Sequence, residues 1–281
     1  MTDALQMAVL SLIALSCGLL SPFVVLKRMA MFANSLSHTI LLGIAIAFLL
    51  TGSLFSPISL FVGALLAALM TALLTGGLIR FFRLQEDASI GLVFTALFAL
   101  GITAVTLFTR DVHLGIEAVM GNADVLQIGD LYLALFLAGV NLAAVCLFFK
   151  QFQLISFDQT LAKALRISSS RFHFFLLFLI SATSIAAFRA VGVLLVLAFL
   201  VGPFLTARLF CKRLPHLLFW TPLIGILASV LGVLLSRVCF EVFALPLSTG
   251  GMVATLIGLI YVLAKWVKSI KLRGCEKRSP S

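Results

Sequence analysis

Charged residues are scarce in this sequence: Asp, Glu, Lys and Arg make up 11% of its 281 residues, whereas apolar residues make up 62%. Together with a mean hydropathy of +1.23, this composition excludes a soluble domain and indicates a polytopic integral membrane protein. The basic residues behind the net charge of +10 occur in short clusters between apolar runs, without an aromatic-interleaved basic stripe. We therefore expect membrane lipid, and no nucleic acid, as a partner.

Sequence motifs for several kinds of chemistry are also missing. The five cysteines show no CxxC spacing, which argues against a disulfide framework or a metal cluster. No G-x-x-x-x-G-K-[ST] phosphate loop occurs, so the chain cannot hydrolyse ATP by that route, and no H-E-x-x-H motif occurs either. Asp and Glu are absent from the middle of the apolar runs, which argues against an ion-coupled secondary transporter. We expect a protein that is not itself an enzyme.

Apolar runs long enough to cross the bilayer, about 20 residues each, are what the sequence has in abundance. They predict an all-α bundle of about nine membrane spans. The predicted spans cover residues 5–26, 31–51, 58–79, 89–109, 130–149, 172–188, 190–210, 217–239 and 250–267. The weakest divide lies between the sixth and seventh, where only Arg189 interrupts the run, and this leaves open a short or re-entrant segment there.

Lys and Arg are distributed unevenly between the two sides of these spans. With the N-terminus outside, 17 of the 20 fall on the inner side, and only Arg110, Arg189 and Arg237 fall outside. This bias predicts an outer N-terminus and a cytoplasmic C-terminus. Because the basic pair Lys27 and Arg28 follows the first apolar run, that run is expected to remain as an anchor and not to be a cleaved signal.

The chain is predicted to consist of a transmembrane domain, residues 1–268, and a basic cytoplasmic tail, residues 269–281, that needs no fold and lies along anionic lipid. At the predicted outer rim, Arg237 and Glu241 are four residues apart and can pair on one helix face.

Residues 29–43, MAMFANSLSHTILLG, bring polar side chains into the second predicted span. Asn34 and His38 are four residues apart, so on a helix they share one face. At about 1.5 Å of rise per residue, His38 lies roughly 10 to 15 Å beyond Arg28, inside the bilayer. The segment is therefore either a substrate site or a polar start to a helix, and the depth of His38 favours the site.

Three loops have features beyond those of a simple connection. Glu86 and Asp87 precede the fourth span, where acidic residues also cap helix N-termini. The outer loop 110–129 is either a short helix on the membrane surface or a docking surface. The inner loop 150–171 contains a short amphipathic helix that Asp158 could cap. Its apolar face needs either a partner groove or the lipid surface.

Five segments, in this order and spacing, resemble the permease subunit of the ATP-binding-cassette importers that take up zinc, manganese or iron. They are LKRMAMFANSLSHTILLGIAIAFLL, EDASIGLVFTALFALG, SFDQTLAKAL, AVGVLLVLAFLVGPFLTARL and FALPLSTGGMVATLIGLIYVLA. The resemblance implies the type II importer architecture and a place in the bacterial cytoplasmic (inner) membrane as a multi-pass subunit. A looser relation, to permeases for metal chelates of the siderophore or cobalamin type, gives the alternative function.

The resemblance also implies roles for particular residues. His38 matches the family's metal ligand, whereas Asn34 stands where the family usually has an acidic residue. Glu86 and Asp87 match the inner gate. Residues 157–168 match the helix that couples to the ATPase, with Gln159 and Arg166 departing from the family pattern. The four coupling residues that this match implies are Phe157, Asp158, Ala162 and Leu165.

The partners that the resemblance implies are a cytoplasmic ATPase dimer, an external metal-binding lipoprotein and a second permease subunit. The metal is the substrate and no cofactor is expected to stay bound. Because Asn offers a weaker, neutral oxygen ligand, we hypothesise that the second permease differs from this one and retains the acidic residue. Manganese, zinc and ferrous iron share ligand types, so the sequence does not choose among them.

Overall fold

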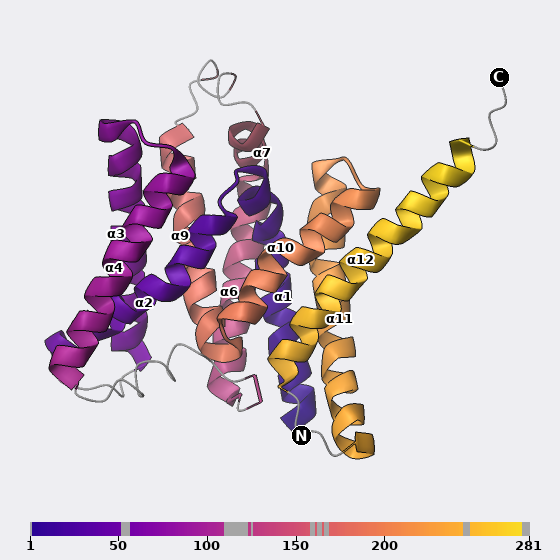
Figure 1. Ribbon diagram of the computed structural model, residues 1–281, viewed down its shortest axis with the longest axis horizontal. Coiled ribbons are helices and arrows are strands. Elements are labelled where there is room, and N and C mark those ends of the chain that lie inside the picture. Colours follow the sequence, from indigo (N-terminus) through magenta and orange to yellow (C-terminus); the bar gives the residue numbers. More distant parts are fainter. Residues whose placement is uncertain are drawn as a thin grey trace. The chain divides into compact units, whose positions relative to one another are not determined.

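The structure is a computed structural model that describes residues 2–51, 57–109, 123–124, 126–157, 161, 165, 169–243 and 248–276. Over these residues the chain folds into ten helices, which confirms the predicted all-α fold (Figure 1). They are α1 (Thr2–Leu26), α2 (Ala30–Thr51), α3 (Pro57–Phe82), α4 (Glu86–Thr109), α6 (Ile128–Leu147), α7 (Phe149–Phe157), α9 (Ser169–Val191), α10 (Val193–Phe210), α11 (Leu214–Phe243) and α12 (Thr249–Glu276).

Most of the predicted spans coincide with long apolar helices. Eight helices in the described part of the chain are long and apolar enough to cross a membrane: α1, α3, α4, α6, α9, α10, α11 and α12. α2 is not among these eight, but its 22 residues match the second predicted span, residues 31–51, in position and length. Such lengths agree with the roughly 20 residues that a hydrocarbon layer requires. The chain is therefore a multi-pass membrane protein.

The divide between the sixth and seventh spans was predicted at Arg189, and this was wrong. α9 runs through Arg189 to Val191 with the Arg side chain exposed, and the break falls at Gly192. Gly192 has a φ of 85°, and its N–H donates to the Phe188 carbonyl at 2.9 Å. A glycine in the left-handed region is a common helix terminator, whereas an exposed Arg at a helix end costs little. Both α9 and α10 are long enough to be full spans.

The last helix passes the predicted boundary between the transmembrane domain and the tail. α12 continues beyond residue 268 to Glu276, so the first part of the predicted tail is helical and not without a fold. Lys268 accounts for part of this, because its Nζ donates to the Leu209 carbonyl at the C-terminal end of α10 at 2.7 Å. A cation at unsatisfied helix carbonyls is favourable. Residues 277–281 lie outside the described part of the chain.

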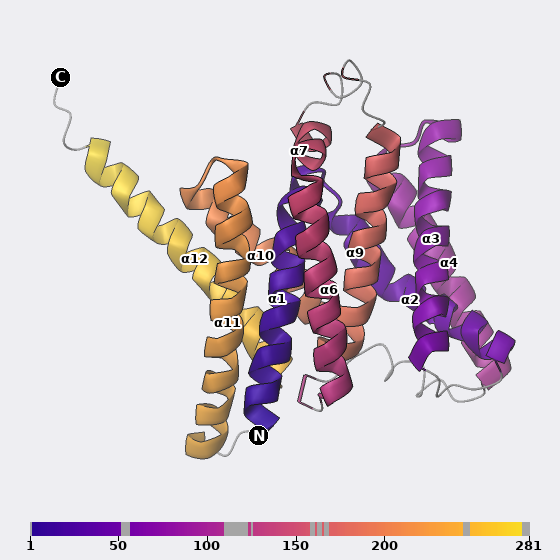
Figure 2. The ribbon, with the colours of Figure 1, turned by 180° about the vertical axis from the view of Figure 1, so that it is seen from behind.

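The helices form two compact units, and each is described by itself. Unit 1 comprises residues 1–25, 123–147 and 194–281, and unit 2 comprises residues 26–122 and 148–193. In unit 1, α11 packs along α12. In unit 2, α2 packs against both α3 and α4, and α9 packs against α2 and α3, as seen from both sides in Figures 1 and 2.

Glycines let helices of unit 1 approach closely. A Cβ at Gly18 of α1 would lie 2.7 Å from the Pro222 Cα of α11, and one at Gly202 would lie 2.2 Å from Ile257 Cγ2 of α12. Gly202 therefore lets α10 lie close to α12. Small residues at helix crossings are typical of membrane bundles, where packing replaces the hydrophobic effect between helices.

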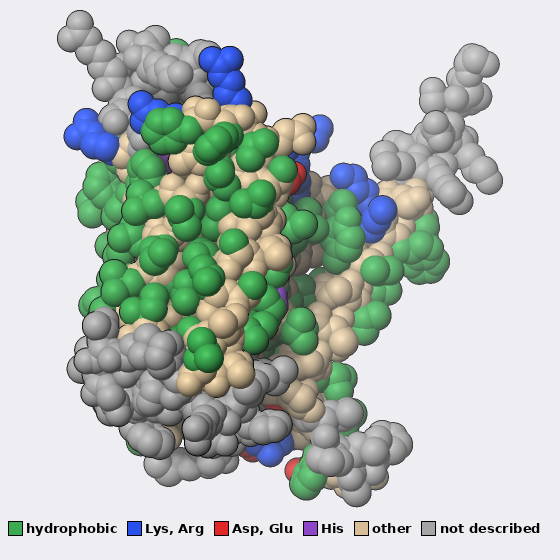
Figure 3. Space-filling model, turned by 60° about the vertical axis from the view of Figure 1, so that its left-hand side comes forward, with side chains coloured by type: hydrophobic (Ala, Val, Ile, Leu, Met, Phe, Trp, Pro, Cys, Tyr) green, Lys and Arg blue, Asp and Glu red, His purple; other side chains and the backbone are tan. Residues whose placement is uncertain are grey.

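Unit 2 presents a broad apolar surface along α3 and α4. Figure 3 shows hydrophobic side chains over this face, with Lys and Arg side chains toward one end. Exposed leucines on the two helices include Leu69, Leu73, Leu92 and Leu107. A water-exposed face of this kind would be a liability, whereas the same face against lipid tails is satisfied. The surface therefore supports the membrane assignment.

Candidate functional site

The predicted site lies near the N-terminal end of α2 in unit 2. Asn34 and His38 both lie on this helix, one turn apart, and both are partly buried. Ser35 and Thr39 satisfy their hydroxyls within the helix, donating to the carbonyls of Phe32 (2.8 Å) and Leu36 (3.3 Å). Those two hydroxyls are therefore structural. The Ser37 side chain lies outside the described part of the structure.

The His38 ring lies against two aromatic rings of α4. Its centroid is 5.1 Å from that of Phe94, with the planes inclined at 52°. It is 5.3 Å from that of Phe98, at 67°. These are tilted and edge-to-face contacts of the kind that aromatic rings prefer. Sequence analysis missed this pairing, because the partners are far apart along the chain and nothing local to α2 indicates which helix it faces.

The helix face that carries His38 continues as the α2–α4 interface. Leu42, one turn on, packs with Val93 and Leu97 in one buried cluster, and Ala45 packs with Val105 in the next. On the opposite side α2 meets α3 backbone to backbone, since a Cβ at Gly43 would lie 2.4 Å from the Gly63 carbonyl oxygen. α2 is therefore held between two neighbours, which fixes the position of His38.

The described side chains of unit 2 provide few metal donors around His38. Nowhere in the described residues do three or more His, Cys, Asp or Glu side chains come together as a possible metal centre. A closed structural site needs about four ligands, so the described part of this chain does not contain one. A site for a passing ion requires fewer, because the ion must also leave.

A second histidine lies near the beginning of α2. Lys27 Nζ donates to His173 Nδ1 of α9 at 3.2 Å, and His173 also lines a cavity of about 70 Å³. The cavity is otherwise mostly apolar, with Met29, Phe32 and Thr75 among its lining residues. An ammonium group beside the imidazole disfavours a bound cation, so this pair is a poor candidate for a metal site.

The two predicted gate residues lie in the first turn of α4, where the capping interpretation also places them. α4 begins at Glu86, whose side chain lies outside the described part, and the Asp87 side chain is exposed. The first turn is closed by Ser89, whose N–H and hydroxyl both donate to the Gln85 carbonyl at 2.9 Å. The gate role of both acids remains a prediction.

The predicted coupling segment is described only in part. Phe157 ends α7 and is 61% exposed, and Leu165 is 56% exposed. Asp158 and Ala162 lie outside the described residues. Exposed apolar side chains that form one patch usually mark an interaction site, whereas singly exposed ones are common. The exposure of Phe157 and Leu165 agrees with a docking role, which stays a prediction.

An aromatic cluster that sequence analysis missed holds the two ends of this segment together. Phe152 of α7 stacks on Phe175 of α9, with centroids 6.1 Å apart and planes at 12°, and Phe152 is fully buried. Phe148 and Phe172 complete the cluster at 5.6 Å from each other. The spacing of these phenylalanines along each helix is a signal that could have revealed it. The two helices that flank residues 158–168, α7 and α9, are therefore packed firmly together.

In unit 1, polar side chains join four segments: α1, residues 123–124, α11 and α12. Gln6 of α1 donates to the Ala123 carbonyl at 2.7 Å and to Asp124 Oδ1 at 3.1 Å. Thr249 of α12 also donates to Asp124 Oδ1. Arg237 of α11 forms an ion pair with Asp3 of α1, so the predicted pairing of Arg237 with Glu241 was wrong. Arg237 pairs with Asp3, which is distant in the sequence, and not with the nearby Glu241.

Long apolar helices in the described part of the chain, one of them carrying a histidine, define a polytopic membrane protein. The ABC 3 transport family matches residues 1–268, and the chain belongs to this family. It is a permease of an ATP-binding-cassette metal transport system, as its resemblance to such permeases had implied.

Several named relatives support this membership. A probable metal transport system membrane protein of Chlamydia muridarum is 38% identical, with 92% of this chain and 83% of the relative covered. The manganese transport system membrane protein MntD of Bacillus subtilis is 37% identical over 90% of this chain and 88% of its own. The chelated iron transport system membrane protein YfeD of Yersinia pestis is 31% identical, covering 94% and 84% respectively.

A solved structure shares the fold over most of its length. PsaBC from Streptococcus pneumoniae, solved in complex with Fab, superimposes with a TM-score of 0.77 at 25% identity, covering 92% of this chain and 89% of the matched chain. The chain therefore has the fold of an importer permease, as the resemblance to the type II importers had implied.

Proposed function

We propose that this permease carries a divalent transition metal ion, manganese, zinc or ferrous iron, into the cytoplasm, with His38 as a ligand that the ion meets on its way. The observation that carries the proposal is the position of His38. It is an imidazole within a long apolar helix, one turn from Asn34, in a chain whose relatives are named for manganese, iron-chelate and metal transport. Polar groups at membrane depth are usually functional, and imidazole suits these metals.

Transport of a metal chelate is the second candidate. The name of the Yersinia pestis relative, a chelated iron transport protein, favours it. The two candidates differ in what limits passage, because a bare ion needs ligands whereas a chelate already has them. Competition distinguishes them: if the ion is the substrate, an excess of a strong metal-free chelator abolishes uptake, whereas a metal-loaded siderophore or cobalamin does not compete.

The energy for transport must come from another subunit, because this sequence lacks a phosphate-binding loop. We propose that a cytoplasmic ATPase dimer docks at residues 157–168, where Phe157 and Leu165 expose large apolar side chains. An external metal-binding lipoprotein delivers the ion. Glu86 and Asp87, at the start of α4, form the inner gate.

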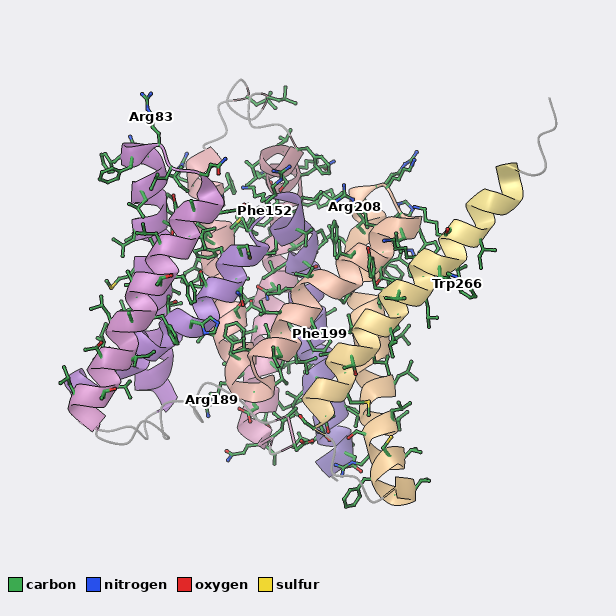
Figure 4. The ribbon with its side chains drawn as sticks, viewed as in Figure 1. Arg83, Phe152, Arg189, Phe199, Arg208 and Trp266 are labelled. Carbon is green, nitrogen blue, oxygen red and sulfur yellow. The ribbon has the colours of Figure 1, made fainter. Side chains whose placement is uncertain are left out.

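The proposed orientation places the N-terminus outside and the C-terminus in the cytoplasm. Contacts within each unit support the alternation. Asp3, Asp124, Arg237 and Thr249, all predicted outside, join through one polar network, and Lys268 meets Leu209 on the predicted inner side. In unit 2, Arg83 and Arg189, predicted on opposite sides, lie at opposite ends, with Phe152 toward the end of Arg83 (Figure 4).

We also propose that this chain pairs with a second, unlike permease that retains an acidic residue at the position of Asn34. The support is chemical: an amide oxygen is neutral, and the described part of this chain brings no three metal-binding side chains together. One carboxylate from the partner would restore charge to the path. Purification of the complex and identification of its subunits tests this, and finding only two copies of this chain would sink the idea.

The test of the proposed function is His38→Ala in cells that express the complete transporter. We expect metal uptake to be lost while the protein reaches the membrane at the wild-type level by immunoblot, because Ala removes the nitrogen ligand but keeps the helix. The matched control is His216→Ala on α11, whose side chain is exposed. Near-normal uptake by the His38 variant would make this residue structural.

A further inference from the structure

His38 has an apolar wall on one side. Phe94 and Phe98 lie one turn apart on α4, with ring centroids 5.9 Å apart and planes at 18°, so the two rings form one continuous surface. The imidazole of His38 contacts both rings, at 5.1 and 5.3 Å between centroids. Nothing in the sequence of α2 or in the family resemblance had assigned a role to these phenylalanines.

The wall restricts what the imidazole can do. A phenyl ring offers neither a strong donor nor a strong acceptor, so on that side His38 meets no water and no strong hydrogen-bond partner. A ring held by two neighbours also has fewer orientations to lose when it binds a ligand. The nitrogen that binds the ion is thereby kept in one direction before the ion arrives.

The wall is itself held in place. Phe98 packs against the buried pair Ala45 and Val105, which joins α2 to α4. Between the two phenylalanines on the same helix, Leu97 lies in the buried cluster with Leu42 and Val93. A shift of the Phe98 ring away from His38 would therefore disturb the packing between α2 and α4. The arrangement is thus a property of a packed interface and not of a loose surface contact.

We propose that Phe94 and Phe98 are positioning residues that hold the His38 imidazole for the ion and set its affinity. This rests on the proposed function, in which His38 is an ion ligand. The wall acts through His38 alone, since the phenyl rings themselves coordinate nothing. Loss of a ring should therefore weaken ion binding without stopping the transport cycle.

The experiment measures the concentration dependence of ⁵⁴Mn²⁺ uptake in cells expressing the complete transporter. Phe94→Leu and Phe98→Leu remove one aromatic contact each, and Phe94→Tyr and Phe98→Tyr keep the ring. Phe178→Leu on α9, a half-exposed phenylalanine of the same unit, is the matched control. We expect each Leu variant to raise KM by about two- to tenfold, the worth of an aromatic contact. We expect Vmax per transporter to stay within about twofold and the Tyr variants to keep the wild-type KM.

Each other outcome counts against the proposal. An unchanged KM in both Leu variants overturns it, and so does a lower Vmax or a lower protein level at unchanged KM, since that marks a packing role only. Phe94→Met, which removes the ring but leaves a flexible side chain that adapts to the gap, is measured alongside so that a poorly inserted Leu variant does not decide the result. If His38→Ala transports normally, the proposed function itself fails, whereas loss in His38→Ala with normal Leu variants removes only the positioning role.

Discussion

At the scale of single residues, the proposed site depends on the difference between an amide and a carboxylate. Asn34 keeps the size and position of the acidic residue usual in the family but not its charge, and His38 keeps the imidazole. One amide oxygen beside one imidazole holds a divalent ion less tightly than a carboxylate beside the same imidazole does. Weak binding suits passage, and under the proposed function the missing charge comes from a second permease subunit.

A second residue, Gly43, decides how closely α2 lies against α3. A Cβ there would lie 2.4 Å from the Gly63 carbonyl oxygen and 2.8 Å from the Ala64 Cα. Because these are backbone atoms, no side-chain rotation relieves the clash, and α2 would have to move together with His38.

We therefore expect Gly43→Ala to destabilise the permease by about 1 to 3 kcal/mol, the usual cost of overpacking. The measurement is the thermal unfolding midpoint of the purified complex in detergent. Gly91→Ala is the matched control, since a Cβ there meets nothing within 4 Å and Ala favours helix. Equal midpoints for the two variants would show that α2 and α3 are not in backbone contact.

At the scale of helices, the short helix α7 connects the membrane-spanning helix α6 to the predicted coupling segment. Its inner face, Phe152 and Ile155, is fully buried, and Phe152 stacks on Phe175 of α9. Its last residue, Phe157, is exposed. A helix with one anchored face and one free end can carry a displacement of the loop to α9, because a packed cluster shifts as a body.

Phe152→Ala should loosen the packing of α7 against α9. Removing a fully buried phenylalanine costs about 3 to 5 kcal/mol of packing, so we expect ATP hydrolysis by the assembled transporter to lose its stimulation by the external binding protein. The readout is ATPase activity with and without that protein. Phe178→Ala, on the exposed side of α9, serves as the control and should keep the stimulation. Full stimulation in the Phe152 variant would remove α7 from the coupling route.

At the scale of the whole molecule, the claim is an alternation of segments between two sides of a membrane. In unit 1, one polar network connects segments that are predicted to lie outside. Its members are Asp3, Gln6, Asp124, Arg237 and Thr249. The bond from Lys268 to Leu209 gathers predicted inner ones. Sidedness follows from the basic bias of the loops.

Cysteine labelling tests the sidedness. In a cysteine-free background, Ser248→Cys should react with a membrane-impermeant maleimide on intact cells. Lys212→Cys should react only after permeabilisation. Both positions are exposed, so accessibility to solvent does not differ between them. The opposite pattern would invert the proposed orientation.

The sequence predicts what is local and periodic, and it fails where distant segments choose each other. The long apolar runs gave the spans, and the four-residue spacing placed Asn34 and His38 on one face. The helix break at Gly192 was not predicted, because a hydropathy pattern responds to the charge of Arg189 but contains no information on the positive φ of Gly192. Arg237 was paired with Glu241 because the ion pair with Asp3 depends on how α1 meets α11, and no local pattern indicates it. The aromatic wall beside His38 was missed for the same reason.

The most direct measurement is metal accumulation in proteoliposomes that contain the complete transporter. With ATP inside and the loaded binding protein outside, the account predicts accumulation of manganese, zinc or ferrous ion that requires both, and that is lost in His38→Ala although the complex still assembles. Accumulation of a metal chelate only, or ion accumulation that is driven by a proton gradient without ATP, would contradict it.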